Sequence, residues 1–258
     1  MNMFGLESKR IIITGASKGL GSVCAKVLAD NGAELVLMSR SEKELESVRM
    51  SLENPEKHLA VALDLTDMGQ LHGGIKRAQE FLEDIDVVLH VVGGGLGLRD
   101  SLLGADDFMK LFTLNVVVAA EINRMIAPGM VKKGSGNLVH IASIASSEST
   151  ASVGYNTVKA ALAAYVRSLG REIAGSGIVA TGILPGGFYA PNNSWERLEA
   201  ENPDVVKKFV DERLPRKFLG KAEELIPMIL LLCSDAASMM GGCLVPIDAG
   251  EGRSYLVP

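Results

Sequence analysis

Short apolar runs alternate with longer amphipathic segments along almost the whole chain. The apolar runs are rich in Val, Ile and Leu and lack the strict alternation of strands that expose one face to water. They therefore predict strands that are covered on both faces. Seven such strands are expected, at Arg10–Thr14, Ala33–Met38, Leu59–Leu63, Val87–Val92, Asn137–Ala142, Ile178–Ile183 and Leu244–Ile247.

The segments between these runs have helical periodicity. They predict helices at Gly19–Asn31, Glu42–Glu53, Asp67–Glu83, Ala105–Val131, Ser152–Ala174 and Ala222–Cys233. Parallel strands need crossover connections, and right-handed crossovers place helices on both faces of a sheet. The pattern predicts an α/β fold: a doubly wound, seven-stranded parallel sheet of the Rossmann type, formed by one domain over residues 1–258.

One segment, at about residues 186–215, interrupts this alternation. It lies between a predicted strand and the next helix, and it contains the only tryptophan, Trp195. A long insertion at the carboxyl end of a strand is typical of a substrate lid or pocket wall. An oligomer contact or a plain surface helix is the alternative interpretation.

A glycine-rich turn follows the first strand, with the sequence Thr14-Gly15-Ala16-Ser17-Lys18-Gly19-Leu20-Gly21. In a strand–turn–helix unit, glycines let a pyrophosphate approach the backbone, and the helix N-terminus supplies N–H groups for the phosphates. The same letters match the nucleophile elbow of serine hydrolases, with Ser17 as nucleophile. That alternative is remote, because the last histidine is His140 and a hydrolase elbow does not belong on the first strand.

The end of the second strand bears on the choice of cofactor. Dinucleotide folds often have an acid there for the ribose 2′-hydroxyl, whereas NADP sites have an arginine nearby. Here the strand ends in Ser39-Arg40, and Lys18 adds a cation in the glycine turn. Guanidinium groups match phosphate geometry, so the sequence predicts NADP(H) rather than NAD(H). Two solvated surface charges are the alternative.

Tyr155 and Lys159 are four residues apart in a predicted helix, and Ser143 precedes them. Residues four apart share a helix face, so the phenol and the ammonium can face one cleft. A neighbouring cation lowers the pKa of a tyrosine and suits it to acid–base catalysis, while the Ser143 hydroxyl can hold the reacting oxygen. This spacing occurs often by chance, and the glycine turn is what gives it weight.

With the glycine turn, Asp64, Asn115, Ser143, Tyr155 and Lys159 in this order, the chain resembles the short-chain dehydrogenase/reductase family over residues 6–250. It is most similar to members of the 3-oxoacyl-carrier-protein reductase type and their sugar, polyol and polyketide relatives. The resemblance implies that Tyr155 is the acid/base, that Lys159 lowers its pKa and binds the nicotinamide ribose, and that Ser143 holds the substrate oxygen. Asn115 is implied to hold a water that links Lys159 to solvent.

The same resemblance implies a set of cofactor contacts. The phosphates and the adenosine ribose are expected at Gly15, Ser17, Lys18 and Leu20; the 2′-phosphate at Arg40; the adenine at Asp64 and Leu65; and the nicotinamide half at Gly93, Tyr155, Lys159, Pro185, Gly186 and Phe188.

The chain departs from the family pattern at three places. His90-Val91-Val92-Gly93 replaces the usual Asn-Asn-Ala-Gly, and Ala190 stands where a threonine often caps the carboxamide. Extra glycines continue through Gly97, and they either open space in the floor of the site or form a loose turn. His90 has two open interpretations, a substitute for an asparagine or a core histidine. These departures leave the substrate class open.

The composition limits the kinds of binding partner that we expect. The net charge of −5 argues against nucleic acid or an anionic membrane, and no signal peptide is recognised before Ile11–Ile13. The longest apolar stretch, around Leu225–Cys233, is too short to span a bilayer.

The three cysteines, Cys24, Cys233 and Cys243, are expected to be buried reduced thiols, and the histidine spacing predicts no metal site. We expect a cytoplasmic protein.

These observations predict an NADP(H)-dependent oxidoreductase that transfers hydride between nicotinamide and a carbonyl or secondary alcohol. An NADP(H)-binding regulatory or scaffolding protein without turnover is the alternative. The substrate stays open between an acyl thioester and a sugar, polyol or other ketone, although Tyr189, Asn192, Asn193 and Trp195 suit a carbohydrate-like ligand. The resemblance implies a homotetramer or homodimer that pairs the long fourth and fifth helices.

Overall fold

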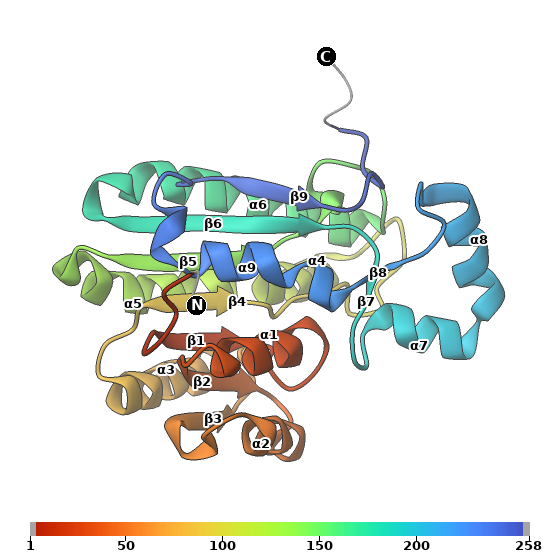
Figure 1. Cartoon of the computed structure of the whole chain (residues 1–258). Coiled ribbons are helices and arrows are strands. Elements are labelled where there is room, and N and C mark those ends of the chain that lie inside the picture. The colour runs from red at the N-terminus through yellow and green to blue at the C-terminus, as the bar shows by residue number, and fades with distance from the viewer. Residues whose placement is uncertain (1–3, 255–258) are drawn as a thin grey trace.

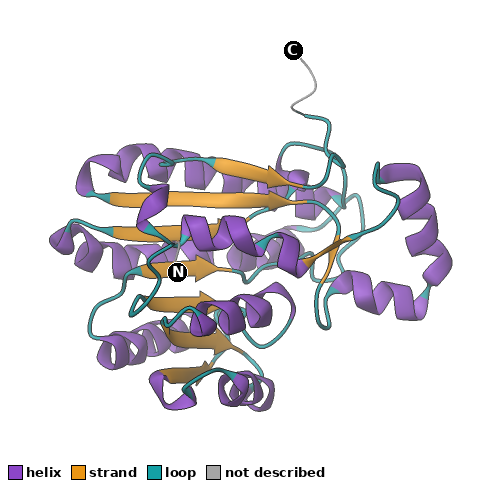
Figure 2. Cartoon of the chain, viewed as in Figure 1, coloured by secondary structure: helices purple, strands orange, loops and turns teal. Residues whose placement is uncertain are grey.

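Seven parallel strands form one sheet in the computed structural model, which describes residues 4–254. Their order across the sheet is β3-β2-β1-β4-β5-β6-β9, so the predicted doubly wound α/β fold is confirmed (Figure 1). The arrowheads of these seven strands point in one direction, so their carboxyl ends lie together along one side of the sheet (Figure 2). The strands are β1 (Arg10–Thr14), β2 (Glu34–Ser39), β3 (His58–Ala62), β4 (Val87–His90), β5 (Gly136–Ile141), β6 (Ile178–Pro185) and β9 (Leu244–Ile247).

The alternation of side chains along each strand builds two cores. Ile11 and Ile13 point into one core and Ile12 into the other, because successive strand residues face opposite sides of the sheet. Three helices pack on the first core: α1 (Gly19–Asp30), α2 (Glu42–Ser51) and α9 (Ile226–Leu232). On the other face lie α3 (Met68–Leu82), α5 (Val118–Lys133) and α6 (Val153–Ile173).

Polar caps set several helix starts close to the predicted positions. Ser41 accepts a hydrogen bond from the Glu44 N–H before α2, and Asp67 accepts from Gly69 and Gln70 before α3. The predicted helix at Ala222–Cys233 is divided into a 3-10 turn and α9, with Pro227 in the first turn of α9. The 3-10 turns are η1 (Pro55–Lys57), η3 (Ile144–Ser146), η4 (Ala174–Ser176), η5 (Ala222–Glu224) and η6 (Asp235–Ala237).

The predicted helix at Ala105–Val131 is interrupted. It consists of α4 (Ala105–Phe112), a π-helical turn η2 (Thr113–Val117) and α5. By length and composition the whole stretch Ala105–Lys133 could cross a membrane, yet Val118, Ile122 and Ile126 pack against the sheet. It is therefore a core helix of the fold.

The excursion at about residues 186–215 contains two helices, α7 (Ser194–Glu201) and α8 (Pro203–Arg213), which extend beyond the sheet (Figure 1). A short parallel sheet of β7 (Phe188–Tyr189) and β8 (Gly220–Lys221) joins them to the body. The helices have their own apolar cluster around Val206, and Trp195 packs on Phe209 with ring centres 4.4 Å apart.

Three of the residues that we expected to suit a carbohydrate-like ligand, Tyr189, Asn193 and Trp195, also contribute to the structure of the excursion. Asn193 caps α7 and donates to the Phe188 carbonyl, whereas Tyr189 packs in the same cluster as Trp195. Burial, together with a hydrogen bond to Glu199, raises the pKa of Tyr189 to about 12.

The cysteine prediction is correct in part. Cys24 and Cys233 are buried in the core between the sheet and the α1 and α9 helices. Burial raises the pKa of the Cys233 thiol to about 12, which keeps it protonated and unreactive. Cys243 is exposed, contrary to prediction, because it lies in the turn that enters the last strand at the edge of the sheet.

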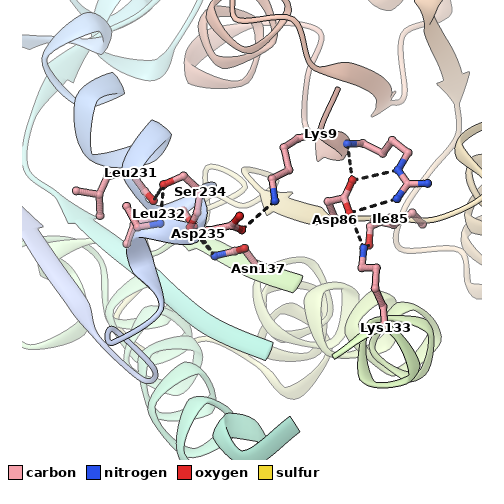
Figure 3. A network of polar contacts seen from close by, with 11 residues as sticks. Lys9, Ile85, Asp86, Lys133, Asn137, Leu231, Leu232, Ser234 and Asp235 are labelled. Carbon is pink, nitrogen blue, oxygen red and sulfur yellow. Dashed lines mark hydrogen bonds and ion pairs between the residues drawn. The ribbon is translucent and has the colours of Figure 1, made fainter. Parts of the chain in front are cut away.

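Charged residues are paired at the amino edge of the sheet (Figure 3). Asp86 accepts hydrogen bonds from the backbone and side chain of Arg10, and the Lys133 Nζ atom lies 2.5 Å from its Oδ1. Burial alone would raise the pKa of Asp86, but these donors outweigh it and hold the pKa at about 2. Nearby, the buried Asn137 amide donates to the Leu232 carbonyl at the end of α9 and to the Ser234 carbonyl just after it.

Candidate active site

The predicted site residues lie at the other edge of the sheet, where the strands have their carboxyl ends. Arg40 follows β2, Asp64 and Leu65 follow β3, Gly93 follows β4, Ser143 follows β5, and Pro185 ends β6. In doubly wound sheets this edge is where ligands bind, because the crossover loops leave a crevice there.

Tyr155 and Lys159 lie one turn apart near the start of α6, so their side chains share a helix face. The Lys159 Nζ atom is 5.6 Å from the centre of the Tyr155 ring and donates to the Ile141 carbonyl at 3.0 Å. The Ser143 side chain lies close enough to the Tyr155 hydroxyl to lower the pKa of that phenol. The fold thus brings the three predicted residues together between β5 and α6.

The charge state of this group differs from the expectation. We expected Lys159 to lower the pKa of Tyr155, but burial raises that pKa, and the hydrogen bond from Ser143 offsets burial only in part. Burial also lowers the pKa of Lys159, to about 8. Because a low-dielectric surrounding penalises both charges, the phenol keeps its proton at neutral pH.

Asn115 enters the site through the π-helical turn η2. Its amide clamps Gly94, accepting from the Gly94 N–H and donating to the Gly94 carbonyl, both at 3.0 Å. A Cβ on Gly93 would lie 2.9 Å from Asn115 Oδ1 and 3.1 Å from Lys159 Nζ. Gly93 is therefore where Asn115 and Lys159 meet, and the Asn115 side chain holds a loop rather than pointing to solvent.

The glycine turn is fixed to both neighbouring strands. Gly15 has φ +71°, which favours glycine, and a Cβ there would lie 3.0 Å from the Val92 backbone nitrogen. The Gly15 N–H donates to the Met38 carbonyl at 2.7 Å. On the other side, the Gly19 N–H at the start of α1 donates to the carbonyl of Pro191, so the excursion contacts the turn directly.

Three polar groups lie where a ribose phosphate is expected. Lys18 and Arg40 are exposed. Hydrogen bonds from Thr66 lower the pKa of Asp64, and the nearby Arg40 guanidinium lowers it by a smaller amount. Ser39 is 8% exposed, and its hydroxyl has no hydrogen-bond partner among residues 4–254. Leu20 and Leu65, by contrast, are side chains of the two cores.

The Pro185–Phe188 loop leaves the end of β6. The Gly186 N–H donates to the Ile247 carbonyl, and the Gly187 N–H donates to Glu251. Sequence reasoning missed Glu251, because 64 residues separate it from Gly187 and nothing in its neighbourhood marks it. It missed Ser39 as well, although its position beside Arg40 at a strand end was a usable signal.

The four histidines of the chain all have other partners, which removes the hydrolase interpretation of Ser17. His58 bonds the Leu35 N–H and the Glu53 carbonyl, and His72 pairs with Glu121. His90 and His140 are buried and stacked, with ring centres 4.6 Å apart. Within residues 4–254, no group of three or more metal-ligating side chains is arranged to hold a metal ion.

The Asn123 side chain bridges the two stacked rings, which decides between the two interpretations of His90. Its oxygen lies 2.8 Å from His90 Nε2, and its nitrogen contacts His140 Nε2 and the Tyr165 hydroxyl. His90 is thus a core histidine. An amide oxygen accepts and an amide nitrogen donates, so His90 donates through Nε2, whereas His140 accepts through Nε2 and fits the network only when neutral. Burial accordingly lowers the pKa of His140 to about 4 and that of His90 further still.

Comparison with known proteins gives consistent matches over the whole chain. Gluconate 5-dehydrogenase of Gluconobacter oxydans is 28% identical over 253 residues, which cover 96% of both chains. The 3-oxoacyl-acyl-carrier-protein reductase of Thermotoga maritima is 27% identical over 95% of this chain and 98% of that enzyme. L-sorbose reductase from Gluconobacter frateurii, solved with NADPH and L-sorbose, has a TM-score of 0.88 at 26% identity and covers 97% of this chain.

The family model for short chain dehydrogenases matches residues 9–201, which is well over half of the chain. That range begins at β1 and includes the glycine turn, Ser143, Tyr155 and Lys159. The chain therefore belongs to the short-chain dehydrogenase/reductase family and is an oxidoreductase that acts on carbonyl or alcohol groups with NAD(P).

Proposed function

We propose that this enzyme is an NADP(H)-dependent carbonyl reductase, or the corresponding secondary-alcohol dehydrogenase, with Tyr155 as its acid/base. The observation that carries the proposal is the convergence of Ser143, Tyr155 and the buried Lys159, whose Nζ atom lies 5.6 Å from the Tyr155 ring centre, on the same side of the sheet as the glycine turn. Perturbed pKa values that cluster in this way favour a catalytic role.

The proposed mechanism assigns one task to each residue. The nicotinamide supplies or accepts the hydride. The Ser143 hydroxyl orients the substrate oxygen, and Tyr155 gives that oxygen a proton during reduction. Because burial raises the pKa of Tyr155, the residue holds this proton at neutral pH, which favours the reducing direction. Lys159 stabilises the phenolate that remains, and Asn115 fixes the Gly93–Gly94 backbone beside it.

The residues present fit a dinucleotide. The glycine turn would hold the phosphates at Gly15, Ser17, Lys18 and Leu20, and the loop from Pro185 to Phe188, with Gly186, would hold the carboxamide. Asp64 and Leu65 would border the adenine, and Gly93 the ribose. Lys18 and Arg40 are exposed cations at the 2′-phosphate position, and the unpartnered Ser39 hydroxyl gives a third donor there. This trio supports NADP(H).

A charge reversal tests the cofactor choice. Arg40→Asp should lower the ratio of kcat/KM with NADPH to kcat/KM with NADH by about 10²-fold, because a carboxylate repels the 2′-phosphate and accepts from a 2′-hydroxyl. The control is Arg171→Asp, an exposed change in the last turn of α6. An unaltered ratio in steady-state kinetics would remove Arg40 from the proposal.

The substrate class is tested by NADPH oxidation across a panel. L-sorbose and a 3-oxoacyl thioester are included, together with gluconate in the oxidising direction, because relatives carry these substrates in their names. Since Tyr189, Asn193 and Trp195 serve the excursion's own packing, the structure gives no preference for sugars. NADPH binding without turnover on any substrate would instead favour the regulatory alternative.

We propose a homotetramer or homodimer, in the cytoplasm, that pairs the fourth and fifth predicted helices, which correspond to α4–α5 and to α6. Met109 and Phe112 on α4 and Val131 on α5 are apolar yet exposed, by 60%, 38% and 50%. Paired helices would cover them. Light scattering should give a multiple of the 27.4 kDa chain, and Met109→Asp should shift it towards the monomer. A wild-type monomer would contradict this pairing.

A further inference from the structure

The segment from Asp248 to Ser254 follows β9, and Glu251 is its buried charged residue. Glu251 is 8% exposed, and its Oε2 atom accepts a hydrogen bond from the Gly187 N–H at 2.6 Å. A carboxylate that accepts from a backbone N–H makes a short, strong bond. The bond therefore fixes Gly187, in the middle of the loop proposed for the carboxamide.

The neighbouring glycine is shaped to admit this carboxylate. A Cβ on Gly186 would lie 2.6 Å from Glu251 Oε2 and 2.8 Å from Asp248 Cβ. The carbonyl of Gly187 accepts from the Gly220 N–H at 3.1 Å, through the small sheet at the base of the excursion. Gly187 is therefore held from two sides, by Glu251 on one and by β8 on the other.

The Asp248–Ser254 segment is also fastened to the loop that follows Ser143. Glu148 Oε1 accepts from the backbone N–H groups of Arg253 and Ser254, the latter at 2.8 Å. The segment is stiffened internally, because the Asp248 carboxylate accepts from Gly250 and Gly252, each at 3.0 Å. It thus connects the Ser143 loop to the Gly187 loop.

The charges around Glu251 come from three parts of the chain. Burial raises the pKa of Glu251, and Asp248 and Glu148 raise it further. The Gly187 N–H and the Arg213 guanidinium, at the end of α8, act in the opposite direction. Acidic residues are exposed in most proteins, and burying a carboxylate costs free energy. The burial of Glu251 beside two like charges therefore indicates a structural role in the Gly187 loop.

We propose that Glu251 is a positioning residue for the nicotinamide half of the site: it holds the Gly186–Phe188 loop in the orientation that receives the carboxamide. The Asp248–Ser254 segment that contains Glu251 is bonded through Glu148 to the loop that follows Ser143, so the two loops are linked through this segment. This inference rests on the proposed function, because it assumes that the loop contacts the cofactor.

The test compares Glu251→Ala, Glu251→Gln and the control Glu80→Ala, an exposed acid on α3. Glu251→Ala should raise the KM and the Kd for NADPH by about tenfold, because a hydrogen bond to a charged group is lost. The KM for the carbonyl substrate should change by less than about twofold. Glu251→Gln should restore NADPH affinity to within about threefold of wild type, since its amide oxygen can accept from Gly187.

The outcomes separate this inference from the proposed function. Wild-type affinity for NADPH in Glu251→Ala would overturn the role of Glu251 alone, as would a Glu251→Gln variant as weak as the alanine variant. Wild-type protein that neither binds nor oxidises NADPH would overturn the proposed function itself. Glu251→Met, which keeps the side-chain length and loses the oxygen acceptors, replaces Glu251→Ala if that variant does not fold.

Discussion

The two edges of the sheet use polar residues in opposite ways. At the amino edge Asp86 is surrounded by donors from Arg10 and Lys133, and its pKa is low, at about 2 (Figure 3). At the carboxyl edge the Ser39 hydroxyl and His90 Nδ1 have no partner within residues 4–254, and the pKa of Lys159 is lowered to about 8. The surroundings of Asp86 stabilise its negative charge, whereas the surroundings of Lys159 disfavour its positive charge.

The difference separates stability from chemistry within one fold. A paired, partly buried carboxylate contributes to the free energy of folding, and an unpartnered buried group costs it. At the carboxyl ends, burial lowers the pKa of Lys159 to about 8, which is closer to neutral pH, and such perturbed values are typical of functional sites. Changes at the two edges should therefore affect different measurements, and the following predictions test that separation.

Removing the Tyr155 hydroxyl should give the largest effect. Tyr155→Phe should lower kcat by about 10³-fold, since the general acid is lost while the helix keeps its packing. NADPH affinity, measured by fluorescence titration, should stay within about threefold. Tyr165→Phe, on the same helix with its hydroxyl bonded to Asn123, is the control and should keep most of the turnover. A Tyr155→Phe rate near wild type would contradict the assignment.

Acid should destabilise the carboxyl edge first. The pKa of His140 is about 4 when folded and 6.5 ordinarily, so the unfolded chain binds more protons between these values. The stability is full above pH 6.5 and should fall as the pH drops towards 4, with a loss of about 2 kcal/mol at pH 5 from His140. Denaturant titrations at several pH values measure it. If His140→Asn has the same pH profile, His140 is not the cause.

At the amino ends of the strands, Asp86 should stay ionised at pH 5, because its pKa is about 2. A mutation there should instead lower the free energy of unfolding. Asp86→Ala should lower the free energy of unfolding by about 2 kcal/mol, because Arg10 and Lys133 lose their shared partner. Asp84→Ala removes an exposed partner of Arg10 and should cost less than about 0.5 kcal/mol. The kcat of the folded Asp86→Ala protein should equal that of wild type. A large loss of kcat would break the separation of the two edges.

The smallest effect is expected at Ser39. Ser39→Ala should leave stability unchanged or slightly raised, because it removes a buried hydroxyl that has no partner in the described residues. It should weaken NADPH binding by about fivefold and NADH binding hardly at all, since only NADPH has the 2′-phosphate. Isothermal titration with both cofactors measures the contrast. Equal losses for the two would place the hydroxyl away from the phosphate.

The sheet was predictable because its signal is local. Runs such as Ile11–Ile13 are apolar on both faces, which identifies buried parallel strands before any contact is known. The glycine turn and the Tyr155–Lys159 spacing are equally short patterns. By contrast, α7 and α8 pack on each other through a small cluster, and the sequence predicted only an insertion there, without the bounds of its two helices.

Features that depend on distant contacts were not predictable. The Glu251–Gly187 and Pro191–Gly19 bonds join segments far apart in the sequence. The raised pKa of Tyr155 reverses the expected sign, because it depends on how deeply α6 packs rather than on the spacing to Lys159. The exposure of Cys243 likewise follows from its place at the edge strand.

The π-helical turn at Thr113–Val117 has a consequence for insertions and deletions. Such a turn contains one residue more than an α-helical turn, and each residue of an α-helix rotates the next by about 100°. Deleting one residue there would leave a continuous helix whose α5 half still packs on the sheet, with the Asn115 amide turned away from Gly94. A single lost codon would thus disable the site while preserving the fold.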